Sequence, residues 1–204
     1  MNLEQMLDTQ AGKPTNRVTF ALCVTVLAMA GFVIAFEGVT EAGLRILVRA
    51  SARSSAIYFF TAFAGPGVAL LRWSAVGTWI GHNSPSFFVA FGFSHLVHLL
   101  ALVLWASLFP TSFFSDFRLA PVLVGAMLYL LIAFMCIRLI LYPSSAPRWV
   151  RITESTGNSV LWLAFALAFV SRALSSPVYG LFTLVALGAL GVRLTPKFYA
   201  RSAT

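Results

Sequence analysis

Two of the three histidines of the chain, His95 and His98, lie in the middle of the long apolar run 87–109. At about 1.5 Å per residue they lie roughly 12 to 17 Å from the start of that run, which is near the midplane of a bilayer. Ionisable groups at that depth are costly and indicate a functional site. The i, i+3 spacing places both rings on one helix face. Two roles remain open: ligand or proton relay, or hydrogen bonding between helices with Ser94.

His82, the third histidine, precedes His95 by thirteen residues. In a continuous helix that separation is about 20 Å, which would suit two stacked cofactors. The sequence Asn83-Ser84-Pro85 interrupts such a helix, however. We therefore expect His82 to lie in a loop.

The composition places the chain in a membrane. Apolar residues make up 59% of it, charged residues 10%, and the mean hydropathy is +0.88. A soluble domain has about 25% charged residues, so a soluble enzyme, a disordered protein and a collagen-like protein are excluded. Two cysteines, Cys23 and Cys136, cannot build a disulfide framework. The chain is predicted to be a polytopic membrane protein.

The apolar runs predict an all-α bundle of six transmembrane helices, because a span needs about 20 mostly apolar residues. The expected spans are 18–36, 56–71, 87–109, 119–141, 156–174 and 178–194. A polar cytoplasmic leader, 1–17, precedes this 18–194 domain, and a basic cytoplasmic tail, 195–204, follows it. Gly65-Pro66-Gly67 interrupts the second span. No soluble insert is long enough for a flavin or nucleotide domain.

The net charge of +8 is spread in small groups between the apolar runs. This pattern indicates contacts with membrane lipid head groups and not with nucleic acid. With six spans, nine Lys and Arg residues lie on the side of both termini and five lie opposite. The positive-inside rule then places both termini in the cytoplasm, and we expect a bacterial inner (plasma) membrane.

The connection after the first span carries a regular charge pattern. Glu37, Glu41, Arg45, Arg49 and Arg53 recur at intervals of four, the spacing of neighbours on a helix. We expect a short amphipathic helix at the membrane surface, with Arg45 and Arg49 forming a solvated stripe. For Arg53 two readings stay open, namely a solvated residue and a ligand of an anionic cofactor edge such as a haem propionate.

Residues 45–195 resemble the ferric-reductase-like transmembrane family, which includes the haem-binding membrane subunit of the bacterial methionine-sulfoxide reductase system. The resemblance rests on Arg49-Ala50-Ser51-Ala52-Arg53-Ser54, Trp79, Asn83, Val89-Ala90-Phe91, Ser94-His95, His98-Leu99, Trp149, Gly157 and Trp162-Leu163-Ala164-Phe165.

The resemblance implies b-type haem held by histidines inside six helices, and electrons passed across or along the membrane. The chain would then be the membrane haem subunit of an oxidoreductase, with a redox partner protein or a quinone as electron donor. His98, followed by Leu99-Leu100, matches the family's third-helix ligand, with His95 beside the haem.

One position departs from the family pattern. Four residues after Trp149 the family has a haem-ligating histidine, whereas this chain has Thr153, followed by Glu154. No histidine follows His98. Three outcomes remain: five-coordinate haem on His98 or His95, a sixth ligand from another side chain, or loss of haem. Candidate sixth ligands on the fourth span are Met127, Tyr129, Met135 and Cys136.

Two other functions compete with haem-dependent electron transfer. The first is a non-enzymatic six-helix scaffold or assembly partner, which the missing ligand favours. The second is a small-molecule transporter, for which only Gly65-Pro66-Gly67 offers a broken helix. No Ser-His-Asp arrangement, zinc-protease HExxH or phosphate-binding glycine motif occurs in the sequence.

Overall fold

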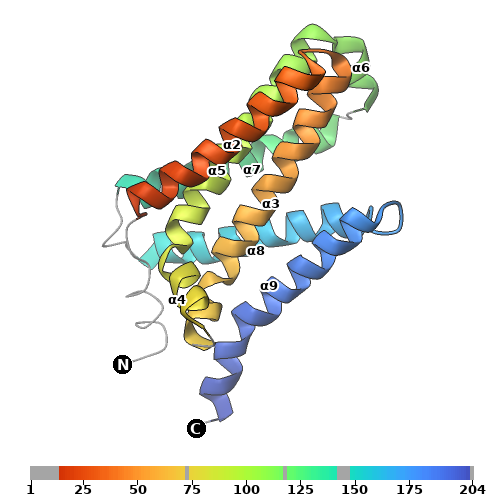
Figure 1. Ribbon diagram of the computed structural model, residues 1–204. Coiled ribbons are helices and arrows are strands. Elements are labelled where there is room, and N and C mark those ends of the chain that lie inside the picture. The colour runs from red at the N-terminus through yellow and green to blue at the C-terminus, as the bar shows by residue number, and fades with distance from the viewer. Residues whose placement is uncertain (1–13, 72–73, 117–118, 142–147, 203–204) are drawn as a thin grey trace.

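The computed structural model describes residues 14–71, 74–116, 119–141 and 148–202, and these residues form an all-α structure. Figure 1 shows its helices, which are α2 (Asn16–Glu37), α3 (Glu41–Leu71), α4 (Ala75–His82), α5 (Ser84–Leu108), α6 (Pro110–Asp116), α7 (Leu119–Leu141), α8 (Arg148–Val170) and α9 (Pro177–Ser202).

Within the described residues, five helices are long and apolar enough to cross a membrane. They are α2, α3, α5, Val122–Leu141 of α7 and Pro177–Thr195 of α9. The protein is therefore a helical membrane protein, but the predicted count of six spans is not confirmed. The expected fifth span falls mostly in α8, whose first two turns carry Arg148, Arg151 and Glu154.

The predicted surface helix and the second span form one helix of 31 residues, α3. The expected interruption at Gly65-Pro66-Gly67 is wrong. Pro66 has no N–H to donate to the preceding turn and normally kinks a helix. Here Arg193 of α9 supports that turn, because its Nη1 donates to the carbonyl oxygen of Phe63 (2.8 Å) and its guanidinium lies 4.4 Å from the centre of the Phe63 ring.

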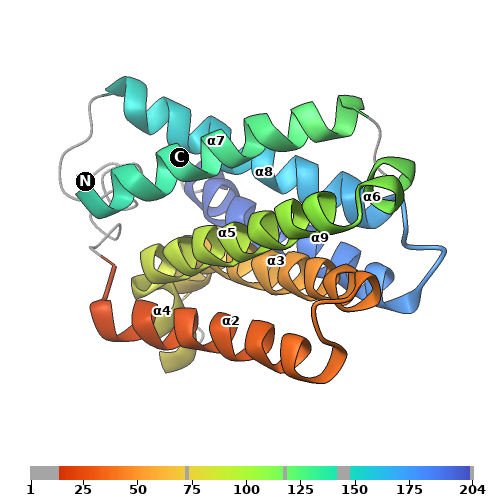
Figure 2. The same ribbon diagram turned by 90° about the horizontal axis from the view of Figure 1, so that it is seen from above.

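The pair α3 and α5 forms the centre of the fold. Figure 2 shows these two helices between α2 on one side and α7 on the other. They run antiparallel, since Leu44 packs with Trp105, Ser51 with His98 and Phe59 with Phe91. Ala30 and Val33 of α2 close one flank against Leu47 and Ala101.

Aromatic side chains fill the space between these helices and α8. The rings of Phe59, Phe91 and Phe165 come from α3, α5 and α8, and their centres lie 5.1 to 6.0 Å apart. Phe59 and Phe91 are fully buried. Phe169 of α8 continues the cluster toward Phe182 of α9. Offset and edge contacts of this kind hold α8 and α9 against the central pair.

Helix α9 meets α3 most closely at a glycine. A Cβ added to Gly67 would overlap the carbonyl oxygen of Val192, so backbone meets backbone at this point. Small residues permit such close approach between membrane helices, where van der Waals packing drives association. Gly67 is thus required by the α3–α9 contact.

We predict that Gly67→Ala lowers the free energy of unfolding by about 1 to 3 kcal/mol, the usual cost of overpacking. Thermal unfolding in detergent, followed by tryptophan fluorescence, measures it. Gly188→Ala in α9 is the matched control, because a Cβ there has nothing within 4 Å and should leave the midpoint nearly unchanged. Equal midpoints for both variants would contradict the close approach.

Candidate functional site

The side chain of His98 is held by α3 through one ring nitrogen. Its Nδ1 lies 3.0 Å from the carbonyl oxygen of Val48 and 3.0 Å from Ser51 Oγ. A carbonyl can only accept, so Nδ1 carries the proton. The hydroxyl of Ser51 donates to the carbonyl of Leu47 (2.7 Å) and therefore accepts from His98. In this neutral ring Nε2 is unprotonated and has a free lone pair.

A group of serine hydroxyls continues this contact along α3 and α5. Ser54, Ser55 and Ser94 each donate to the carbonyl of Ser51, at 3.0, 2.7 and 3.2 Å. Ser94 also lies 2.7 Å from Ser54 Oγ and 3.0 Å from Ser55 Oγ. Ser51, Ser55 and Ser94 are fully buried. Hydrogen bonds inside a bilayer have no water to replace them, so this polar seam fixes the register of α3 against α5.

His95 lies one turn earlier on α5, with its ring centre 5.7 Å from that of His98. Aromatic rings from three helices surround it: Phe91 at 5.0 Å, Tyr129 at 5.1 Å and Phe165 at 5.8 Å. Its Nδ1 is buried and has no hydrogen-bond partner in the described structure. The predicted pairing of the two histidine rings on one helix face is therefore observed, in a mainly aromatic environment.

The candidate sixth ligands on α7 differ in where they point. Met127 is 70% exposed and faces away from the histidines. Met135 packs on Gly157, and Cys136 packs on Gly92. Only Tyr129 contacts a histidine, and its hydroxyl is buried without a partner in the described structure. Tyr129 is the residue of this set that the structure brings to the site.

The position at which the sequence resemblance implied a second histidine lies away from the site. Thr153 hydrogen-bonds to the carbonyl of Trp149 in its own helix (3.0 Å). Phe165, which contacts His95, follows twelve residues later, about 18 Å along α8. Glu154 forms an ion pair with Arg138 of α7 (3.0 Å). Neither Thr153 nor Glu154 reaches the histidines. This chain therefore differs from the family pattern in where the position lies as well as in its residue type.

Arg53 lies on a different face of α3 from the seam. Ser51 and Ser55 face α5, whereas the guanidinium of Arg53, two residues from each, lies 5.7 Å from the ring centre of Tyr179 on α9. A step of two residues is about 200° around a helix. Helix α3 itself therefore separates Arg53 from His98.

His82 is the last residue of α4 and is exposed. The expectation of a loop was wrong, because Ser74 caps a short helix by accepting a hydrogen bond from the Gly77 amide (3.0 Å). The interruption at Asn83 was correct, since α5 begins anew at Ser84. No group of three or more His, Cys, Asp or Glu side chains that could hold a metal ion occurs among the residues described.

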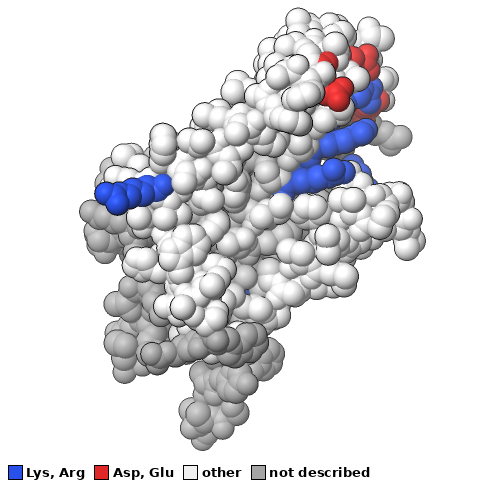
Figure 3. All heavy atoms as spheres, in the orientation of Figure 1, with Lys and Arg blue, Asp and Glu red and all other residues white. Residues whose placement is uncertain are grey.

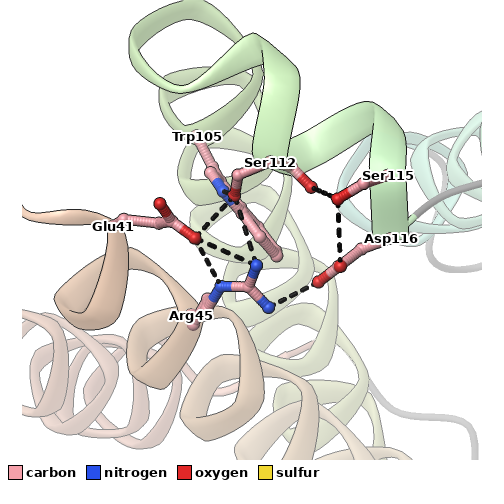
Figure 4. Close-up of polar contacts among 6 residues, drawn as sticks. All are labelled: Glu41, Arg45, Trp105, Ser112, Ser115 and Asp116. Atoms are coloured by element: carbon pink, nitrogen blue, oxygen red, sulfur yellow. Dashed lines mark hydrogen bonds and ion pairs between the residues drawn. The ribbon is translucent and has the colours of Figure 1, made fainter.

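Arg45 is part of a polar network and not of a solvated stripe. Figure 4 shows its guanidinium between Glu41 on α3 and Asp116 on α6, with an ion pair to each. Ser112 donates to Glu41 (2.7 Å) and accepts from Arg45 (3.2 Å) and from Trp105 Nε1 (3.1 Å). The guanidinium also lies 4.5 Å from the centre of the Trp105 ring. The network fastens α6 to the start of α3.

We predict that Arg45→Gln lowers the free energy of unfolding measurably, because two partly exposed carboxylates lose their cation and Ser112 loses a donor. Chemical unfolding in mild detergent measures the change. Arg172→Gln removes an exposed arginine of the connection after α8, which hydrogen-bonds to the nearby carbonyl of Ala168, and should have almost no effect. If the two variants unfold alike, the network does not stabilise the fold.

In the comparisons with known proteins, no family model, curated protein or solved structure matches the chain.

Proposed function

We propose that the protein is a membrane subunit that binds haem b through His98 and passes electrons across or along the membrane. The sequence resemblance to ferric-reductase-like proteins supports this proposal, and so does the surrounding of His98. The electron donor would be a redox protein or a quinone. The haem iron would lack a second histidine ligand from α8, because that helix carries no histidine and Phe165 is its residue that packs on the His95 ring.

The observation that carries the proposal is the hydrogen bond from His98 Nδ1 to the carbonyl of Val48. Histidines that ligate metals usually donate their other ring N–H to a carbonyl or carboxylate, which fixes the tautomer and increases the basicity of the ligating nitrogen. His98 shows this arrangement near the middle of α5, with Nε2 left as the ligating atom.

Two further groups fit a polar cofactor at this place. The Nδ1 of His95 and the hydroxyl of Tyr129 are buried without a partner in the described structure. An unpaired polar group in hydrocarbon costs several kcal/mol, so a bound group that pairs with them would stabilise the site. His98 would hold the iron, with His95 and Tyr129 beside it. The haem iron would supply one-electron chemistry, while the protein sets access and polarity.

The sequence also pointed to Arg53 as a cofactor ligand. The proposed haem site leaves Arg53 out, because it lies on the α9 side of α3.

We predict that the purified protein, titrated with haem, shows a Soret band of a high-spin or mixed-spin ferric centre. His98→Ala should abolish this band, because it removes the ligating nitrogen. His95→Ala should weaken haem binding or shift the reduction potential. His82→Ala is the matched control, since His82 is exposed on α4 and should leave the spectrum unchanged.

Absence of a Soret band from reconstituted wild-type protein would contradict haem binding. A low-spin bis-histidine spectrum would support haem binding but would refute ligation by a single histidine. His82 or a second chain would then have to supply the second imidazole.

A cofactor-free scaffold is the alternative that one observation favours. The rings of Phe59, Phe91 and Phe165 fill the centre of the bundle beside the histidines, and such packing stabilises it without a cofactor. The transporter hypothesis depended on a broken helix at Gly65-Pro66-Gly67, and α3 continues through these residues.

For the orientation we propose that both termini are cytoplasmic. This requires α8 to cross the membrane as well, although it is not apolar enough by composition alone. The ion pair between Glu154 and Arg138 supports such a crossing, because it neutralises a charge that α8 would bring toward the membrane. The short connection 171–176 also joins α8 directly to the apolar span of α9.

We predict that a reporter fused after Thr204 is active only in its cytoplasmic form. Six crossings return the C-terminus to the side of the N-terminus. A reporter fused at Ser175 should be active only in its external form and serves as the internal control. An external reporter at Thr204 together with a cytoplasmic N-terminus would mean five crossings.

A further inference from the structure

Two arginines of α3 form no ion pair with an acidic residue in the part of the chain that the structure describes. Glu41 and Asp116 both pair with Arg45, and Glu154 pairs with Arg138. Arg49 and Arg53 take part in none of the ion pairs among the described residues, and the buried Nε of Arg53 has no hydrogen-bond partner there. Arg49 and Arg53 flank Ser51 on α3, near the level of His98, and a guanidinium within the apolar part of a membrane is costly unless an anion accompanies it. These two side chains therefore need a partner from outside the described chain.

The two arginines lie where α3 and α9 separate. The helices approach each other closely at Gly67 and Val192, and α9 begins near Arg53, whose guanidinium lies over the Tyr179 ring. Figure 3 shows a recess between the upper helices and α9, with blue arginine side chains gathered in it. Arg49, one turn before Arg53, is exposed. The Arg49 side chain is thus accessible, and the half-buried Arg53 side chain lies one turn further along the same helix.

The recess lies at the edge of an apolar span. Tyr179 is the third residue of the span Pro177–Thr195, directly after the polar connection 171–176. Tyrosine at the end of a span is typical of the head-group level of a bilayer, where lipid phosphates lie, and long arginine side chains extend toward that level from deeper positions on a helix. Arginine binds phosphate through parallel N–H donors, and the positive end of the α9 dipole adds to the same field.

We propose that Arg49 and Arg53 form a binding site for the phosphate group of an anionic phospholipid, in the recess between α3 and the start of α9. The lipid phosphate pairs with these two arginines of α3, and its acyl chains lie along the apolar faces of α3 and α9. This site is independent of the proposed haem site, from which α3 separates it.

The test measures lipid binding to the full-length protein in detergent by native mass spectrometry. The probes are dioleoylphosphatidylglycerol, dioleoylphosphatidylcholine and inorganic phosphate. We expect the wild type to bind phosphatidylglycerol in preference to phosphatidylcholine. Arg49→Gln and Arg53→Gln should each weaken phosphatidylglycerol binding by about tenfold or more, the typical effect of losing a charged hydrogen bond.

Arg17→Gln is the charge-matched control. Arg17 is an exposed arginine in the first turn of α2, at the opposite end of the bundle from Arg49 and Arg53. It should bind phosphatidylglycerol like the wild type. If Arg53→Gln fails to fold, Arg49→Gln still tests the site, because the Arg49 side chain is exposed.

Three results would overturn the proposal. The first is equal binding of phosphatidylglycerol by all variants. The second is equal binding of the two lipids by the wild type. The third is full competition by inorganic phosphate, which would make a soluble phosphate the ligand. Haem content, measured on the same samples, separates the two proposals. A loss of haem in Arg53→Gln with unchanged lipid binding would assign the arginine to the cofactor, whereas absence of haem from every sample would leave the lipid result valid.

Discussion

The polar seam between α3 and α5 is the constraint on which the rest of the structure depends. Three hydroxyls converge on the carbonyl of Ser51, while the hydroxyl of Ser51 receives the N–H of His98. The contacts of Ser94 and His98 cross from α5 to α3, so a shift of one turn between the helices would break them in an apolar surrounding that offers no water in exchange. The seam thus sets the register of the central pair and orients His98 at the same time.

The remaining helices follow from that register. It places Phe59 against Phe91, and Phe165 of α8 packs on both rings. It also brings Trp105 beside Leu44, where α6 folds over the start of α3. Arg193 from α9 then supports the turn of α3 that Pro66 weakens. His98 of α5 packs against one face of α3, whereas Arg53 of α3 lies on the face toward α9.

Much of the fold could be predicted from local apolar runs. The run 119–141 coincides with α7, and α2 exceeds its predicted span by only a few residues, because Glu37 and the polar residues near Asn16 mark its ends. The continuity of α3 could not be predicted. Pro66 indicates a break, and the charge pattern before it indicates a separate surface helix. Contacts from other helices nevertheless keep the whole segment in one helix.

The same distinction applies to the site. The depth of His95 and His98 in an apolar run could be inferred from spacing alone. The partners of Arg45 could not, because Asp116 is 71 residues away and lies in a short helix that no apolar run marks. The faces of α3 could be predicted from periodicity, but which neighbouring helix covers each face depends on tertiary packing. For this reason the sequence left open whether Arg53 is solvated or joins a cofactor site with the histidines, whereas in the structure α3 separates it from them.

The central claim is that α3 holds His98 as a neutral ring with Nδ1 protonated and Nε2 free. Solid-state NMR of the haem-free protein in lipid bilayers, with ¹⁵N-labelled histidine, tests it directly, and His98→Ala assigns the signal. The account predicts a protonated Nδ1 and an unprotonated Nε2 for His98. A protonated Nε2, or a ring that exchanges freely between the two tautomers, would contradict it.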